Sequence, residues 1–264
     1  MPGRKTHVAL AAALALSVLA GCTHESPSPR PAPALRVAVP GESPPYAFHQ
    51  GQNGLEVDFA HELAAALGRP LTLVPLDFGD IIPAVSAGRA DMAMAGLTIT
   101  PAREVQIAFS APYLRSGLIA TMRREDTKSY STVDSVLRTR SPIGVVGGTT
   151  GERFVRERAP RASVAVYPTA FAAMNELGQR RVDLVIHDAP VGIWFASRDE
   201  ANLAVLPKLL NEEQLGWGIR RGDEALRADV DRVLAHWQAD GTRDRILARW
   251  LPYWQRLEGA RPSR

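Results

Sequence analysis

The sequence predicts an α/β fold held together by its packed core, and three observations lead to this prediction. Short runs of apolar, β-prone residues alternate with helical patterns from residue 35 to residue 251, an order typical of parallel strands joined by helices. The alternation begins again near residue 143, so the chain comprises two units of similar pattern. Cys22 is the only cysteine, so a packed core and not a disulfide framework must hold these units together.

The N-terminal segment, residues 1–21, has the features of an export signal. Arg4 and Lys5 supply positive charge, and the mostly apolar run Val8–Ala20 is too short to span a bilayer as a helix. The run leads into LAGC, ending at Cys22, which resembles the lipobox of bacterial lipoproteins, where the signal is cut before a cysteine that is then lipidated. We therefore expect a lipid anchor on Cys22 and a protein held at a membrane, in the periplasm or at the cell exterior. The alternative is an ordinary signal with an incidental cysteine.

Composition and charge restrict the possible partners. Residues 22–34 are rich in proline and serine and have no apolar periodicity, so they are predicted to form an extended tether. Removal of Arg4 and Lys5 with the signal leaves 29 of the 31 Lys and Arg residues against 28 Asp and Glu residues. No basic stripe with interleaved aromatic residues follows, so nucleic acid is not an expected partner.

In the first unit, strand and helix patterns follow one another in order. Phe59, Leu63 and Leu67 lie four residues apart on one face of a helix, and Gly68 marks its end. The predicted strands are residues 35–39, 71–76, 90–95 and 117–122, and the predicted helices are residues 58–67 and 80–87.

The second unit repeats this order. The sequence GGTTG at 147–151 separates a strand from a helix that runs to Arg158. Another helix follows Asp188, and Pro190 lies near its start, where proline is tolerated. The other predicted elements are strands at 143–146, 163–167, 182–186 and 215–219, a helix at 170–179, and a helical segment at 223–251 with a break at 240–241.

Signatures of catalysis and of metal binding are missing from the sequence. The six histidines have no metal-ligand spacing, and there is no P-loop, GxSxG elbow or GxGxxG motif. We therefore expect a binding protein and not an enzyme, with no cofactor and no metal.

Four local features suit the two charged ends of a zwitterion, and the first is Arg103. With Thr100 as the N-cap and Pro101 at the first helical position, Arg103 lies in the first turn of a helix, where a cation opposes the helix dipole. This unfavourable placement indicates a role, because a planar guanidinium offers two parallel donors to a carboxylate. A solvated surface arginine is the alternative.

The second feature is the loop after the strand at 90–95. Ala95, Gly96 and Thr98 follow its carboxyl end, where ligands bind in open α/β sheets. Gly96 lets a ligand approach the backbone and Thr98 offers a hydroxyl, although an ordinary turn would also explain them. Phe78, in the loop after the strand at 71–76, is the aromatic residue that best suits a pocket.

The third and fourth features lie at later strand ends. Thr149 and Thr150 precede a helix whose free N–H groups and dipole suit a carboxylate, although either threonine could simply cap that helix. Asp188 could accept hydrogen bonds from an ammonium group, with His187 in the pocket wall, or it could only cap the helix that follows.

These motifs together resemble a known family. From about Leu35 to Trp254 the chain is similar to the family 3 extracellular solute-binding proteins of ABC importers, and within that family to the glutamine-binding proteins. The motifs that carry the resemblance are GLEVDFA at 54–60, PLDFGDIIPA at 75–84, AGLTITPAR at 95–103, AFS at 108–110, PY at 112–113, GGTTG at 147–151, VDLVIHDAP at 182–190 and DGT at 240–242.

The resemblance implies a two-lobed α/β fold of the periplasmic-binding-protein type II, with two crossovers between the lobes. One lobe comprises residues 35–112 and 218–264, the other comprises residues 118–212, and the crossovers are residues 113–117 and 213–217. The implied partners are a small amino acid ligand and the membrane permease of an ABC importer, with the protein itself acting as a monomer.

The resemblance also implies roles for individual residues. Arg103 and Thr98 bind the α-carboxylate of the ligand, and Asp188 and the backbone at Gly96 bind its α-ammonium group. The threonine pair of the GGTTG motif donates from the second lobe, and Phe78 packs on the ligand side chain.

Three positions depart from the glutamine-binding members. Ser43 stands where the family usually has an aromatic residue, Pro40 where the glutamine-binding members have an acidic residue, and Val146 where they have a lysine. These positions normally reach the ligand side chain. The residues for the two charged ends are therefore retained, but glutamine does not follow as the ligand.

The implied mechanism is cleft closure, in which one lobe holds the carboxylate and the other holds the ammonium group. Two alternatives remain. One is a cyclohexadienyl dehydratase-like enzyme acting on prephenate or arogenate, for which the sequence identifies no acid. The other is a sensory lipoprotein that presents its closed form to a receptor.

Overall fold

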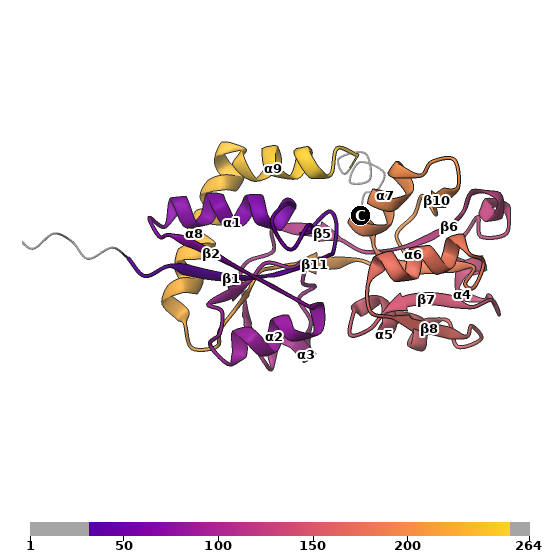
Figure 1. Cartoon of the computed structure of the whole chain (residues 1–264), viewed down its shortest axis with the longest axis horizontal. Coiled ribbons are helices and arrows are strands. Elements are labelled where there is room, and N and C mark those ends of the chain that lie inside the picture. Colours follow the sequence, from indigo (N-terminus) through magenta and orange to yellow (C-terminus); the bar gives the residue numbers. More distant parts are fainter. Residues whose placement is uncertain (1–31, 254–264) are drawn as a thin grey trace, which may run out of the picture. The chain divides into compact units, whose positions relative to one another are not determined.

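The computed structural model describes residues 32–253, which contain two five-stranded sheets with helices packed on them (Figure 1). The strand order is β2-β1-β3-β12-β4 in one sheet and β10-β6-β9-β7-β8 in the other. We call the parts of the chain around these sheets lobe 1 and lobe 2. The predicted export signal, Cys22 and most of the predicted tether lie outside the described residues, as does Trp254.

Lobe 1 contains the N-terminal and C-terminal parts of the described chain. Strand β1 pairs in parallel with β2 and β3, whereas β12, which follows lobe 2 in the chain, inserts antiparallel between β3 and β4. The strands of lobe 1 are β1 (Leu35–Pro40), β2 (Leu71–Leu76), β3 (Met92–Ala93), β4 (Ala108–Phe109) and β12 (Gly218–Ile219). Its helices are α1 (Leu55–Ala66), α2 (Phe78–Ser86), α3 (Pro101–Glu104), α8 (Glu224–Asp240) and α9 (Thr242–Trp250).

Lobe 2 is formed by one continuous stretch of chain. Strand β7 pairs in parallel with β8 and β9, and β6 lies antiparallel between β9 and β10. The strands are β6 (Leu118–Arg123), β7 (Ile143–Val146), β8 (Val164–Tyr167), β9 (Leu184–Asp188) and β10 (Leu203–Val205). The helices are η1 (Arg124–Lys128), α4 (Val133–Leu137), α5 (Thr150–Arg158), α6 (Ala170–Gly178) and α7 (Ala189–Arg198).

Two short strands connect the lobes. β5 (Leu114–Ser116) leads from lobe 1 into lobe 2, β11 (Glu213–Leu215) leads back, and the two pair antiparallel (Figure 1). Both strands fall inside the segments predicted as crossovers. An aromatic cluster in lobe 1 holds the adjoining residues, because Tyr113 stacks on Trp217 with ring centroids 5.1 Å apart and Phe59 packs edge-on against Trp217 at 5.3 Å.

Several local predictions are confirmed. The Thr100 hydroxyl accepts a hydrogen bond from the Arg103 N–H at 3.3 Å, and Pro101 is the first residue of α3. The predicted break at 240–241 separates α8 from α9 at Gly241, whose φ of 80° lies in the left-handed region that favours glycine.

Other predictions are corrected by the structure. The expectation of parallel strands is wrong for β6 and β12, each of which lies antiparallel to both of its neighbours. These are the first strands that the chain adds to each sheet after it crosses between the lobes. The strand predicted at 90–95 is reduced to β3, since the chain leaves the sheet to form the loop that starts at Ala95. The strand predicted at 215–219 divides into β11 and β12, which belong to different sheets. Phe78 is the first residue of α2 and not a loop residue.

Candidate functional site

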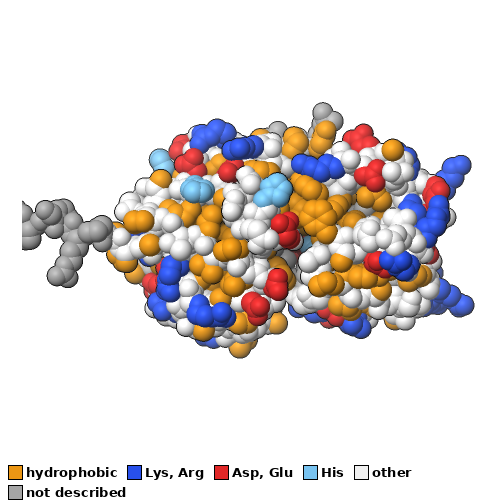
Figure 2. All heavy atoms as spheres, in the orientation of Figure 1, with side chains coloured by type: hydrophobic (Ala, Val, Ile, Leu, Met, Phe, Trp, Pro, Cys, Tyr) orange, Lys and Arg blue, Asp and Glu red, His pale blue; other side chains and the backbone are white. Residues whose placement is uncertain are grey.

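A cavity of about 340 Å³ lies between the two lobes and is lined by residues of both. Figure 2 shows the groove that separates the lobes on one face of the molecule. The structure brings together all nine residues predicted to bind a ligand. They are Phe78, Ala95, Gly96, Thr98 and Arg103 from lobe 1, and Thr149, Thr150, His187 and Asp188 from lobe 2.

The sheet topology explains why residues so far apart in sequence meet. The loops after β1, β2 and β3 leave the same edge of the lobe 1 sheet because these strands are parallel neighbours. The loops after β7 and β9 leave one edge of the lobe 2 sheet for the same reason. The cavity lies where these carboxyl ends face one another, the usual ligand position in open α/β sheets.

Arg103 presents its guanidinium to the cavity from the first turn of α3. Its Nη1 donates to the Thr98 carbonyl at 3.0 Å, and its Cζ lies 5.7 Å from the centroid of the Phe78 ring. Burial lowers the pKa of Arg103 from its ordinary value, and the negative charges of Asp188 and Glu213 oppose that shift. Among the described residues only Nη1 has a hydrogen-bond partner, so Nε and Nη2 are available to a carboxylate.

Asp188 provides the opposite charge at the carboxyl end of β9. Its side chain makes no cap hydrogen bond to α7, so the alternative that it only caps this helix is wrong. Burial and the nearby Glu213 carboxylate together raise the pKa of the Asp188 carboxyl to about 8, and Arg103 and the Tyr46 hydroxyl oppose the shift. Binding of a cation next to the Asp188 carboxyl therefore favours its charged, deprotonated form.

His187 forms part of the cavity wall and is not a cation at neutral pH. Burial lowers the pKa of its imidazole to about 4. Its Nδ1 accepts a hydrogen bond from the backbone N–H of Asp188 at 2.7 Å, which fixes the ring beside that carboxyl group.

The two threonines of the GGTTG motif have different partners. Thr149 is the N-cap of α5, since its hydroxyl accepts from the Glu152 N–H at 3.3 Å and donates to the Val146 carbonyl at 2.7 Å. The Thr150 hydroxyl instead donates to Glu213 at 3.3 Å. The cap interpretation therefore holds for Thr149, and Thr150 faces the crossover between the lobes.

Glu213 is a half-buried residue beside the cavity that the sequence reasoning missed. It lies on the crossover strand β11, and its carboxylate accepts from the Thr98 hydroxyl at 2.7 Å, from Thr150, and from the Asn211 amide at 3.1 Å. One carboxylate thus joins a residue of lobe 1, a residue of lobe 2 and the crossover. No local motif marks Glu213, and only its position in the predicted crossover could have drawn attention to it.

Gly96 and Tyr46 are packed so closely that the loop needs glycine. Gly96 has a φ of 62°, and a Cβ on it would lie 2.5 Å from the Tyr46 ring. Tyr46 lines the cavity and is buried, and its hydroxyl lies beside the Asp188 carboxyl. It lies close enough to Asp188 for the two groups to affect each other's pKa.

Glu56 is a second residue that the sequence reasoning missed. Its fully buried carboxylate accepts hydrogen bonds from the Gly96 N–H at 2.7 Å, the Tyr113 hydroxyl at 2.7 Å and the Trp217 Nε1 at 3.0 Å. Burial raises the pKa of Glu56, and these three donors oppose that shift. Glu56 therefore joins the cavity loop to the residues that flank both crossover strands.

Replacing Glu56 by glutamine is expected to lower the free energy of unfolding by about 1–3 kcal/mol, because an amide NH₂ must then face one of three buried donors. Urea denaturation measures this change. The matched control is Glu62→Gln on the exposed face of the same helix, for which we expect less than about 0.5 kcal/mol. Equal effects of the two substitutions would contradict a structural role for the Glu56 network.

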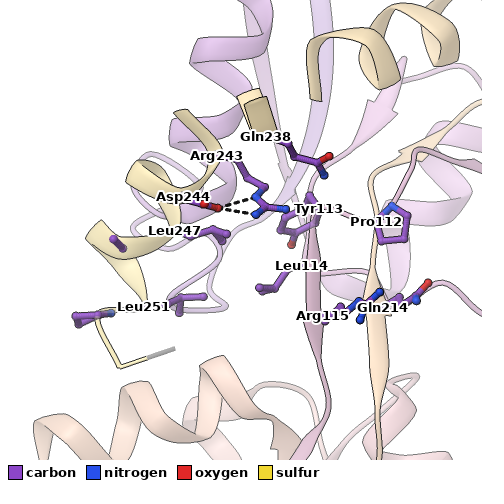
Figure 3. Close-up of a pocket in the computed structure, with 12 residues that line it drawn as sticks. Pro112, Tyr113, Leu114, Arg115, Gln214, Gln238, Arg243, Asp244, Leu247 and Leu251 are labelled. Carbon is purple, nitrogen blue, oxygen red and sulfur yellow. Dashed lines mark hydrogen bonds and ion pairs between the residues drawn. The ribbon is translucent and has the colours of Figure 1, made fainter. Parts of the chain in front are cut away.

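A larger hollow elsewhere lacks the features of this cavity. A hollow of about 650 Å³ lies beside β5 and α9, and its Arg243 and Asp244 are paired with each other at 2.7 Å (Figure 3). Among residues 32–253, no group of three or more His, Cys, Asp or Glu side chains could hold a metal ion. Within the same residues, no helix combines the length and the apolar character needed to cross a membrane.

Comparison with known families identifies the family of this chain. Residues 35–253 match the family described as bacterial extracellular solute-binding proteins, family 3, and the chain belongs to this family. The resemblance inferred from the sequence motifs is therefore confirmed, as is the two-lobed α/β fold.

Individual relatives differ in what they bind or catalyse. The L-cystine-binding protein TcyJ of Escherichia coli (strain K12) is 27% identical over 221 residues, which is 82% of each chain. The cyclohexadienyl dehydratase of Pseudomonas aeruginosa is 28% identical over 230 residues, or 85% of each chain. Among solved structures, an ancestral arginine-binding protein bound to arginine is 28% identical, with a TM-score of 0.76 over 84% of this chain and all of that one.

Proposed function

We propose that this protein is the solute-binding component of an ABC importer and captures an amino acid in the cavity between its lobes. Arg103 binds the α-carboxylate, and Asp188, with the Gly96 carbonyl, binds the α-ammonium group. The binding proteins named above support an amino acid as the ligand class. Binding, and not catalysis, is the activity we propose.

One observation carries this proposal. Arg103 of lobe 1 and Asp188 of lobe 2 line a single cavity of about 340 Å³, the size of a small molecule. A zwitterion can satisfy both only when the lobes are together, so the ligand favours the closed arrangement by contacts that an open one cannot make. Residues 113–117 and 213–217 are the hinges we propose for this motion, between a lobe of residues 35–112 and 218–264 and a lobe of residues 118–212.

The cellular setting is part of the same proposal. The signal at residues 1–21 and lipidation of Cys22 would place the protein in the periplasm or at the cell exterior, with residues 22–34 as the tether. There it would act as a monomer and deliver its ligand to a membrane permease. A receptor that recognises the closed form is the alternative partner.

A thermal-shift screen of the purified protein against the twenty amino acids tests the ligand class. A ligand present at a hundred times its Kd adds about 2.7 kcal/mol of stability, which for a chain of this size raises Tm by about 5–10 °C. We expect at least one amino acid to give such a rise. If none does, while the protein shows a cooperative unfolding transition, amino acid binding is contradicted.

A dehydratase is the second candidate, and one specific observation favours it. Burial raises the pKa of the Asp188 carboxyl to about 8, which favours the protonated acid that loss of the prephenate hydroxyl as water would require. Incubation with prephenate distinguishes the candidates. If the protein releases phenylpyruvate and carbon dioxide, and the Asp188→Asn variant does not, the enzyme is established. If prephenate is recovered unchanged, binding remains the function.

A further inference from the structure

The cavity carries more acidic than basic side chains. Of the charged residues that line it, Arg103 is the only cation, and the acids are Asp188, Glu42 and Asp77. The neutral His187 adds no positive charge. If Arg103 and Asp188 bind the α-carboxylate and α-ammonium groups of an amino acid, the carboxylates of Glu42 and Asp77 remain to bind its side chain.

The two loops that carry these carboxylates are neighbours for a topological reason. Glu42 follows β1 and Asp77 follows β2, and these parallel neighbours are in register at their ends, with Pro40 opposite Leu76. The Gly41 N–H also donates to the Leu76 carbonyl at 3.0 Å, which holds the two loops together. Figure 2 shows acidic side chains along the lobe 1 side of the groove.

No cation in the described part of the chain neutralises this pair. The Glu42 carboxylate accepts one hydrogen bond, from the Gln50 backbone N–H at 3.2 Å, and neither acid has an ion-pair partner among residues 32–253. Asp77 precedes α2 but makes no side-chain cap bond to it. Two like charges without a partner at one edge of a cavity favour a cationic group between them.

A third observation concerns the crossover strand beside the same site. The Glu213 carboxylate, held by the hydroxyls of Thr98 and Thr150, has no ion-pair partner among the described residues and adds negative charge close to Asp188. Tyr46 also lines the cavity, and its buried hydroxyl, which lies beside Asp188, can accept a hydrogen bond from a donor of the ligand. The negative charge near Asp188 therefore favours binding of a ligand with net positive charge over a neutral or acidic one.

We propose that the ligand is an amino acid with a cationic side chain, whose guanidinium or ammonium group lies toward Glu42 and Asp77. This inference rests on the proposed amino acid site and specifies the class of its ligand. The aliphatic part of such a side chain would pass Phe78, the residue next to Asp77 at the start of α2. Because Glu42 and Asp77 are exposed at the edge of the cavity, salt should weaken the preference.

Two pairs of amino acids with matched shape test the proposal by calorimetry at low salt. Citrulline replaces the guanidinium of arginine by a neutral urea, and norleucine lacks the ammonium group of lysine. We expect arginine or lysine to bind at least fivefold more tightly than its neutral counterpart. We also expect Glu42→Gln combined with Asp77→Asn to reduce that ratio by at least threefold.

The matched control combines Glu62→Gln with Asp80→Asn, two exposed acids that do not line the cavity, and it should leave the ratio unchanged. A ratio below fivefold in both pairs, or tighter binding of a neutral amino acid, overturns the cationic ligand and leaves the amino acid site intact. Absence of binding by every amino acid instead overturns the proposed function itself.

Discussion

Replacing Arg103 by alanine is expected to weaken amino acid binding by about thirtyfold to several thousandfold, which corresponds to about 2–5 kcal/mol. The guanidinium is largely buried, its Nη1 is fixed by the Thr98 carbonyl at 3.0 Å, and its remaining donors face the cavity. Its removal would leave the α-carboxylate of the ligand in a low-dielectric site without a counter-charge. Calorimetry with the best ligand from the amino acid screen measures the loss.

Two further variants separate this role from a general effect of charge. Arg103→Lys keeps the charge but loses the planar pair of donors, so its loss should be intermediate. Arg158→Ala removes an exposed arginine at the end of α5 and should change the Kd by less than twofold. A loss below threefold in Arg103→Ala would contradict the carboxylate-binding role.

Replacing Asp188 by asparagine is expected to weaken binding of the same amino acid to a similar extent. Asparagine preserves the volume at the end of β9, but its amide carries no charge to pair with the α-ammonium group. Asp80→Asn on the exposed face of α2 is the matched control and should have little effect. Near-equal affinities of the Asp188→Asn variant and the unmodified protein would rule out this partner for the ammonium group.

The pH dependence gives Asp188 a distinctive signature. The groups that face its carboxyl are the Tyr46 hydroxyl, the Glu213 carboxylate and the Arg103 guanidinium, and with these alone its pKa is about 8. A ligand ammonium group favours the charged carboxylate, so binding below pH 8 releases a proton and affinity rises as the pH increases toward 8. The rise should approach tenfold per pH unit and level off above pH 8. In Asp188→Asn this dependence should be lost.

The sequence was most informative where function depends on local patterns. Short-range signals mark the Thr100-Pro101 start of a helix, the loop at Ala95 and the strand ends near Thr149 and Asp188, and all of these residues except the Thr100-Pro101 pair line the cavity as predicted. The helix starts at Pro101 as predicted, whereas the strand predicted at 182–186 extends instead from Leu184 to Asp188. Their convergence on one cavity follows from the rule that loops at the carboxyl ends of neighbouring strands meet.

Residues that act through long-range packing could not be predicted in this way. Glu56 contacts Tyr113 and Trp217, 57 and 161 positions away in the chain, and Thr98 is 115 positions from Glu213. A sequence pattern does not encode such pairings, because they depend on how the two crossovers bring β5 and β11 together. The direction of the inserted strand β12 was missed for the same reason.

A crystal structure of the protein with its amino acid bound tests the central claim most directly. Our account predicts one ligand in the cavity between the lobes, with its carboxylate within about 3 Å of the Arg103 guanidinium and its ammonium group within about 3 Å of the Asp188 carboxylate. A ligand bound in the hollow beside α9, or one that contacts only one of these two side chains, would contradict it.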